Sequence, residues 1–192
     1  MGSALFVDGG YAIKAWATVA DGAKMDYLKF RKFIEEEAGE QLGDAYYFNC
    51  DNDPPSAAQN GFHSFLRSAP PRGAGIRVKL YWLQTKHHEW PTHMGGGRIV
   101  HPESGEQYVT KAQKAVDVGL AFHLMRSFNK EKWDRLYLVA GDGDFSEVIQ
   151  HLVENEGVHV TVIGNSGSIS SELAPFVQII EFDSIIDKVS KD

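Results

Sequence analysis

Two stretches of the chain share one pattern, an apolar run that stops at an aspartate: residues 4–10 read ALFVDGG and residues 136–145 read LYLVAGDGDF. A short apolar run closed by Asp and Gly is typical of a buried strand that ends in a turn. Comparable strand patterns occur at residues 45–48, 76–83, 158–163 and 177–180, and helical patterns at residues 25–38, 56–67, 110–126, 145–154 and 168–173. Strands that alternate with helices predict an α/β fold, a three-layer sandwich around a central, mostly parallel sheet.

Length and composition favour one globular domain, which we place at residues 4–188. The chain has 192 residues, of which 43% are hydrophobic and 23% charged, the usual range for such a domain. No apolar run approaches the roughly 18 residues that cross a bilayer, and no leader pattern opens the chain. Cys50 is the single cysteine, which excludes an internal disulfide. These features predict a cytoplasmic protein that is not associated with a membrane.

The net charge of -7 argues against a protein whose whole surface grips nucleic acid. The charge is uneven, because residues 67–114 hold eight Lys or Arg against three Glu, a local excess of +5. The rest of the chain therefore carries -7 - 5 = -12. This distribution predicts a basic middle segment in an otherwise acidic protein.

Four aspartates are placed to meet at one edge of the predicted sheet. Asp8 ends the first apolar run, and Asp142 and Asp144 follow the run at 136–140. Asp117 lies in the predicted helix 110–126, which a Thr110-x-x-Gln113 capping box would open. Crowded carboxylates repel one another unless a cation neutralises them. Oxygen ligands without Cys favour Mg²⁺ or Mn²⁺.

Each aspartate also has a structural interpretation. Asp8 and Asp142 stand beside glycines and suit turns, and Asp144 suits a helix cap. Asp117 is harder to explain in this way, because Asp in a helix interior has poor propensity and caps nothing. The joint occurrence of the four residues favours a shared metal site.

Three motifs resemble those of the NYN domain family, LabA-like group, in the PIN-like nuclease superfamily. They are Phe6-Val7-Asp8-Gly9, Lys114-Ala115-Val116-Asp117-Val118 and Val139-Ala140-Gly141-Asp142-Gly143-Asp144-Phe145, and Ser170-Ser171-x-Leu173 is similar as well. Their order and spacing match along nearly the whole chain.

The resemblance implies a five-stranded parallel sheet of order 3-2-1-4-5 and a metal-dependent endoribonuclease, with RNA favoured and DNA an option. Asp8, Asp117, Asp142 and Asp144 would hold Mg²⁺ or Mn²⁺ and act as the catalytic residues. Lys114 would contact the scissile phosphate of a single-stranded RNA, with a surface ion pair to Asp117 as the other interpretation. Members of the superfamily often dimerise, so a homodimer is left open.

Two positions depart from the family pattern. Tyr11 stands where members commonly have Asn, and Gly143 where Ser is frequent. A phenol donates one hydrogen bond but does not act as an amide does. We therefore expect Tyr11 to contact substrate in a different way, with consequences for rate or metal geometry.

Residues 85–109 lose all periodicity and predict a basic, Gly- and His-rich insertion. Lys86, Arg98 and Lys111, together with Trp82 and Trp90, would offer charges to phosphates and rings to unpaired bases. A solvated loop whose tryptophans pack on the sheet is the alternative. A zinc site is disfavoured, because the glycine-rich spacing preorganises no tetrahedral set; it would use His87, His88, His93, His101 and Glu89.

Two other functions compete with the nuclease. A non-catalytic RNA-binding or regulatory module would keep the acidic residues without cleavage. A haloacid dehalogenase-like phosphohydrolase would need an Asp at position 10, which is Gly10 here. For the remaining candidate residues we favour structural roles. These are turns for Asp51 and Asp53, a helix cap for Glu147, and the core for Phe122, Met125, Phe145 and Val148.

Overall fold

The computed structural model describes residues 2–191 and contains one sheet of six parallel strands. The order in the sheet is β3-β2-β1-β6-β7-β8. The strands are β1 (Ser3–Asp8), β2 (Leu42–Asp51), β3 (Arg77–Trp82), β6 (Arg135–Val139), β7 (His159–Gly164) and β8 (Gln178–Glu181). The sheet thus has six strands instead of the five that the family resemblance implies, since β8 adds the strand expected at 177–180 to one edge.

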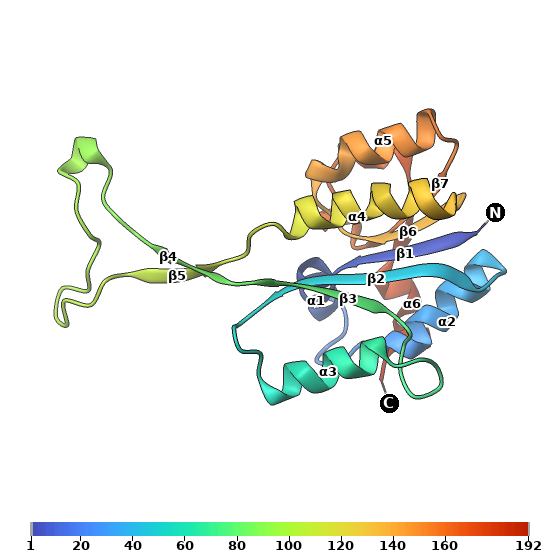
Figure 1. Ribbon diagram of the computed structural model, residues 1–192, viewed down its shortest axis with the longest axis horizontal. Helices are drawn as coiled ribbons and strands as arrows, with labels where there is room; N and C mark the ends of the chain where they lie inside the picture. The colour runs from blue at the N-terminus through green and yellow to red at the C-terminus, as the bar shows by residue number, and fades with distance from the viewer. Residues whose placement is uncertain (1, 192) are drawn as a thin grey trace.

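In the part of the chain that the structure describes, six α-helices cover the two faces of the sheet (Figure 1). One face packs against α1 (Gly9–Ala17), α2 (Tyr27–Ala38), α3 (Ala57–Arg67) and α6 (Phe182–Val189), and the other against α4 (Val116–Glu131) and α5 (Ser146–Glu154). The central strand β1 contributes side chains to the hydrophobic cores on both faces of the sheet, because Leu5 and Val7 face one helical layer while Ala4 and Phe6 face the other. Alternation of this kind is what a strand buried on both faces requires.

Two helices were absent from the sequence prediction. α1 begins directly after Asp8, so the Gly9-Gly10 pair forms the first helical turn instead of a loop. α6 buries Phe182, Ile185 and Val189 at helical spacing near the end of the chain. The helical pattern expected at residues 25–38 corresponds to α2, which Asp26 caps by accepting hydrogen bonds from the backbone N–H groups of Leu28 and Lys29.

The start of α4 corrects one prediction. Thr110 lies in the strand β5 (Val109–Ala112) and forms no capping box, and the helix begins at Val116. Its N-cap, Ala115, has a left-handed backbone (φ 66°) and no side-chain cap. Asp117 therefore lies in the first turn of α4 instead of the second, and Lys114 precedes the helix.

Two further expectations were wrong. Residues 168–173 form no continuous helix; short 3-10 turns occur at Ser166–Ser168 and Ala174–Phe176. Phe122 is 60% exposed, so it does not belong to the core, whereas Phe145 is buried.

The predicted insertion forms an arm, residues 84–112, that projects from the body (Figure 1). β4 (Gln84–His87) pairs antiparallel with β5. Beyond them, isolated bridges join Glu89 to Arg98 and Val100 to Gln107, and the 3-10 turn η1 (Thr92–Met94) lies near the tip.

The arm itself is not basic. It holds Lys86, Arg98 and Lys111 against Glu89, Glu103 and Glu106, a formal charge of 3 - 3 = 0. The positive excess of residues 67–114 lies instead on the body and at the base of the arm, on Arg67, Arg72, Arg77, Lys79 and Lys114.

Candidate functional site

Asp8 joins the central strand to the first helix. Its Oδ1 accepts a hydrogen bond from the Tyr11 backbone N–H at 3.1 Å, which caps α1. The sequence order strand, Asp, Gly-Gly, helix thus fixes one carboxylate at the carboxyl end of β1. One carboxylate oxygen is used by the cap, and the side chain remains partly exposed.

Asp142 and Asp144 come to the same edge because β6 is the neighbour of β1. Val7 pairs with Val139 in the parallel register, so the chain leaves both strands side by side. Asp142 Oδ1 accepts from the Asp144 backbone N–H at 3.0 Å and caps the 3-10 turn η2 (Gly143–Phe145). This loop lies where open α/β sheets commonly bind ligands, at the carboxyl ends of the strands.

Asp117 reaches this edge from α4. Together with Asp144 it lines one end of an open groove of about 630 Å³, whose other walls are apolar. The structure therefore brings residues from β1, α4 and the loop after β6 to one region.

Burial and the charges of neighbouring carboxylates act on Asp8 and Asp117. Burial raises the pKa of Asp8 above its ordinary value, and the charge of Asp117 raises it further, against the hydrogen bond from Tyr11 N–H. Burial also raises the pKa of Asp117, followed by the charges of Asp142 and Asp144. A cation at this edge would favour the charged forms of Asp8 and Asp117 and so offset both pKa shifts.

The chemistry of these donors fits a hard divalent cation, since all four are carboxylates. The side chains do not stand as a closed cage, because within residues 2–191 no group of three or more His, Cys, Asp or Glu is arranged to hold a metal ion. Asp8 and Asp142 each use one oxygen to cap a backbone N–H. Any ion would therefore be held through the oxygens that the caps leave free.

Three polar side chains near the carboxylates escaped the sequence analysis. The Gln113 amide lies beside Asp8, since a Cβ built on Gly10 would be 3.3 Å from Asp8 Oδ1 and 3.4 Å from Gln113 Oε1. A Cβ on Gly143 would approach Glu172 Oε2 to 2.7 Å and Ser170 Oγ to 2.8 Å. This crowding explains why Gly143 replaces the Ser frequent in the family. The Ser170-Ser171 motif was the available signal.

Tyr11 occupies a slot between two strand ends. Its hydroxyl pairs with Ser168 Oγ at 2.8 Å, and the Asn165 backbone N–H lies 3.4 Å away. Its ring lies against Gly141 and Gly164, where added Cβ atoms would come within 2.4 and 2.1 Å of Tyr11. Tyr11 thus anchors the loop after β7, and its contact with substrate stays a prediction.

Asp51 is buried rather than part of an exposed turn. Its Oδ1 accepts from Gln59 Nε2 at 2.9 Å, and its Oδ2 lies 3.4 Å from His63 Nε2. Asp51 and His63 are 2% and 1% exposed. Burial lowers the pKa of His63 against the opposing charge of Asp51, so the neutral imidazole is favoured.

The predicted substrate contacts lie in two places. Lys114 is exposed just before α4, near the acidic edge. Lys86 and Lys111 lie on the paired strands of the arm, and Arg98 and Trp90 lie farther out. Their roles toward RNA stay predictions.

Three arm histidines, His87, His88 and His101, form hydrogen bonds to neighbouring groups. His87 Nδ1 lies 3.1 Å from Gln107 Oε1, and His88 Nε2 lies 2.8 Å from Thr110 Oγ1. His101 Nδ1 accepts from the backbone N–H groups of Glu103 and Ser104, both at 3.3 Å. These bonds give no support to the zinc site that the sequence analysis had already disfavoured.

The family follows from comparison with known sequences. Residues 3–179, which span the three acidic motifs, match the NYN domain. The chain belongs to the NYN domain family. NYN domains form part of the PIN-like nuclease superfamily.

Two similar proteins extend this result. The low amplitude and bright protein LabA of Synechococcus elongatus is 25% identical to this NYN chain over 193 residues, covering 98% of the chain and 89% of LabA. The crystal structure of VPA0982 from Vibrio parahaemolyticus, described as a protein of unknown function, matches with a TM-score of 0.63 at 20% identity. That match covers 99% of this chain and 96% of VPA0982, and supports the fold alone.

Among residues 2–191, no helix is long and apolar enough to span a membrane.

Proposed function

We propose that this NYN domain is a divalent-metal-dependent nuclease that cleaves phosphodiester bonds, with single-stranded RNA as the favoured substrate. One observation carries the proposal: carboxylates from β1, α4 and the loop after β6 come to one sheet edge, where burial and the charge of Asp117 raise the pKa of Asp8, and burial and the charges of Asp142 and Asp144 raise the pKa of Asp117. A purely structural role does not need these charges, because the backbone N–H groups that Asp8 and Asp142 cap could be capped by neutral Asn or Ser.

Each of the four carboxylates has a position suited to metal-dependent cleavage. Asp8 and Asp142 are fixed by the backbone N–H groups that they cap. Asp117 and Asp144 border the open groove, where a strand of RNA has access. A bound Mg²⁺ or Mn²⁺ would lower the pKa of its water ligand and neutralise charge on the phosphoryl oxygens.

The reaction is hydrolysis. Water attacks phosphorus, the bond from phosphorus to the 3′-oxygen breaks, and the products carry a 5′-phosphate and a 3′-hydroxyl. Lys114 would contact the scissile phosphate from the start of α4. Cations that bind phosphate supply sequence-independent affinity, which predicts strong salt dependence.

Cleavage of end-labelled single-stranded RNA by the purified chain tests the proposal. We expect cleavage with Mg²⁺ or Mn²⁺, none with EDTA, and a loss in Asp142→Asn. Removing a group that only hydrogen-bonds to a metal ligand typically lowers metal affinity or activity about 10–100-fold. The loss of a ligand should therefore lower the cleavage rate by at least that range. Asp183→Asn is the matched control, since Asp183 is an exposed first-turn Asp on α6, in the opposite helical layer.

A non-catalytic RNA-binding module is the second candidate. The open arrangement of the carboxylates within residues 2–191 favours it, because a preformed cage would have indicated turnover more strongly. RNA that binds equally to the wild type and to Asp142→Asn, and stays intact with both metals, would replace the nuclease by this module.

A further inference from the structure

The edge strand β3 carries two cations on the face of the sheet that α4 and α5 cover. In the parallel register Arg77 pairs with Tyr46 and Lys79 with Phe48, and neighbours in a sheet point to the same face. Tyr46 and Phe48 pack in the hydrophobic core on that face. Arg77 is paired with Asp44 and lies over the Tyr46 ring, with 5.3 Å from its Cζ to the ring centre. Lys79 is partly exposed, and within residues 2–191 no carboxylate forms an ion pair with it.

The side of α4 next to β3 adds a second cation without a carboxylate partner, Arg126. Burial lowers the pKa of His123, and the charges of Lys79 and Arg126 lower it further, so both cations lie near this one imidazole. Arg126 is exposed and forms no ion pair in the described part of the chain. From Val118 to Lys130, α4 contains no Asp or Glu. This part of the surface is therefore positive, although the chain as a whole carries a net charge of -7.

Phe122 is exposed beside these cations. Its ring centre lies 5.5 Å from that of His123 in an edge-on arrangement, and 60% of the residue is exposed. Val118, one helical turn earlier, is 75% exposed. Both residues line the groove whose acidic end is formed by Asp117 and Asp144. An exposed aromatic ring next to unpaired cations is a typical arrangement for binding unpaired bases and their phosphates.

We refer to Lys79, Phe122 and Arg126 as the α4 strip. An α-helix rises about 1.5 Å per residue, so Arg126 lies about 14 Å along the helix axis from Asp117, with Phe122 between them. The order along this side of the molecule is thus carboxylate, exposed ring, cation. A nucleic acid strand alternates charged phosphates with flat bases, so one strand can contact all three groups.

We propose that the α4 strip binds single-stranded RNA on one side of the cleavage position, with phosphates on Lys79 and Arg126 and an unpaired base on Phe122. This placement rests on the proposed function for the path of the strand, which continues from the strip to the carboxylates. A duplex fits less well, since its bases are paired and stacked and leave no free face for Phe122. An acidic polypeptide would satisfy the cations but leave the ring without a flat partner.

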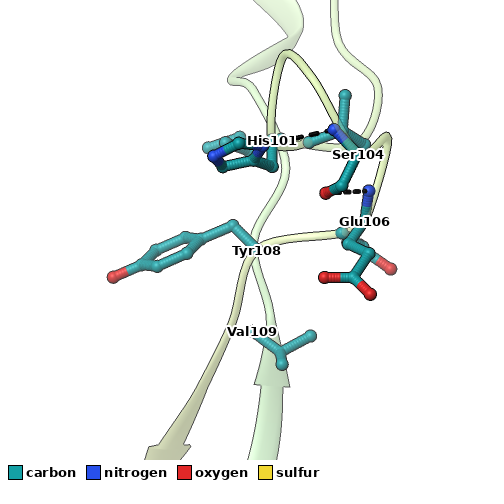
Figure 2. A pocket seen from close by; sticks show the side chains of 8 residues that line it. His101, Ser104, Glu106, Tyr108 and Val109 are labelled. Atoms are coloured by element: carbon teal, nitrogen blue, oxygen red, sulfur yellow. Dashed lines mark hydrogen bonds between the residues drawn. The ribbon is translucent and has the colours of Figure 1, made fainter.

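The outer arm is a weaker candidate for holding this strand. Residues 88–108 contain one Arg against three Glu, a formal charge of 1 - 3 = -2. Figure 2 shows that Glu106 lies beside the turn where the Ser104 N–H donates to His101 Nδ1, so the hollow of the arm has a carboxylate at its border. An excess of cations attracts phosphates, and the α4 strip has this excess while the outer arm lacks it.

Binding of a fluorescein-labelled oligouridine of about 12 nucleotides, followed by anisotropy in EDTA, tests the strip without cleavage. Each cation that contacts a phosphate of a single strand contributes about 0.7 to the slope of log K against log salt. We expect Lys79→Gln and Arg126→Gln each to reduce the slope by about that amount and to raise Kd about fivefold at about 0.1 M salt. Lys32→Gln is the matched control, since Lys32 is exposed on α2 in the opposite helical layer. Circular dichroism establishes that each variant is folded.

A second probe tests the base contact. An oligouridine with a central 2-aminopurine loses fluorescence when this base stacks on an aromatic ring. We expect Phe122→Ala to abolish the quenching and to raise Kd about fivefold or more, with the salt slope unchanged, because stacking releases no counterions. Phe122→Trp should restore both signals. Ile13→Ala is the control, since Ile13 is 55% exposed on α1, outside the strip.

The possible outcomes separate this proposal from the nuclease. A wild-type Kd and slope in both Gln variants, or unchanged quenching in Phe122→Ala, overturns the strip even when the RNA is cleaved. Weakened binding in these variants supports the strip even when Mg²⁺ and Mn²⁺ leave the RNA intact, a result that overturns the nuclease alone. Displacement of the RNA by oligoglutamate at equal charge concentration identifies an acidic protein as the occupant and overturns the strip as an RNA site.

Discussion

Replacing Gly164 by Ala tests how Tyr11 is held at the sheet edge. Gly164 ends β7, and its added Cβ would lie 2.1 Å from Tyr11 Oη and 2.9 Å from Cζ. Ordinary contacts begin near 3.4 Å, so the ring must shift by about 3.4 - 2.1 = 1.3 Å. The opposite ring edge already lies against Gly141, where a Cβ would be 2.4 Å from Tyr11 Cε2. The ring therefore lies between the Gly141 and Gly164 backbones, which restricts its movement away from either one.

The expected cost has two parts. Overpacking of this severity costs about 1–3 kcal/mol. A shift of 1.3 Å also breaks the hydrogen bond from Tyr11 to Ser168, which contributes about 1 kcal/mol. We therefore expect Gly164→Ala to lower the free energy of unfolding by about 2–4 kcal/mol.

Urea denaturation of four chains measures this cost: wild type, Gly164→Ala, Tyr11→Ala and the double variant. An unchanged m-value and a midpoint lowered on the order of 1 M are expected for Gly164→Ala. In the Tyr11→Ala background the same change should cost less than about 0.5 kcal/mol, which gives a coupling energy of about 2 kcal/mol or more. Gly43→Ala is the control, since its Cβ would have 3.8 Å to its nearest neighbour.

Additivity would refute the reasoning. If Gly164→Ala costs the same with and without the Tyr11 ring, the ring is not the obstacle. Gly141→Ala provides a second check, because its Cβ would also meet the Ser168 backbone oxygen at 2.3 Å. Removing Tyr11 should therefore rescue Gly141→Ala only in part.

Three further predictions concern charge and buried polar groups. At pH 7 in EDTA, Asp8→Asn should have a higher urea midpoint than the wild type, because the folded state raises the pKa of Asp8 and so disfavours its charged form. This difference should vanish below pH 3.8, where the Asp8 carboxyl of the wild type is protonated in both the folded and the unfolded state. The pKa of His63 is lowered from 6.5 in the folded protein, so below pH 6.5 the unfolded state binds the proton more readily and stability should fall until the pH reaches the folded pKa. Urea midpoints measured over this pH range should show the slope in the wild type and not in His63→Gln. Ser127→Ala should cost about 1–3 kcal/mol in thermal or urea unfolding, since the Trp133 Nε1–H donates to Ser127 Oγ at 3.0 Å and both are buried.

The sheet was predictable because its strands are buried on both faces. Ala4–Val7 and Leu136–Ala140 are fully or almost fully buried, and such positions select continuous apolar runs that are visible in the sequence. The edge strand β8 is more exposed, yet Val177–Ile180 retains enough apolar character to be found. Strand order, in contrast, came only from family resemblance, since local sequence does not encode which strands pair.

Helix boundaries were less predictable, for two local reasons. The Gly9-Gly10 pair has the composition of a turn, but Asp8 caps the backbone and the buried Ala12, Ala15 and Trp16 hold α1 against the sheet. Thr110-x-x-Gln113 has the spacing of a capping box, but the pairing of β5 with β4 holds Thr110 in an extended conformation. In both cases tertiary contacts override a local signal.

The candidate site shows the same division between what local sequence encodes and what it does not. Asp8, Asp142 and Asp144 were found because strand ends are readable and parallel strands bring their carboxyl ends to one edge. Gln113 and Glu172 were not found, because their proximity depends on loops whose paths are set by close packing around glycines such as Gly10 and Gly143. A glycine that leaves room for a neighbour's functional group has no signature of its own in the sequence. In a fold of this kind, the groups that would bind a metal are therefore easier to predict than the groups that would orient them, and variants of Gly10 and Gly143 should disturb the site without removing any carboxylate.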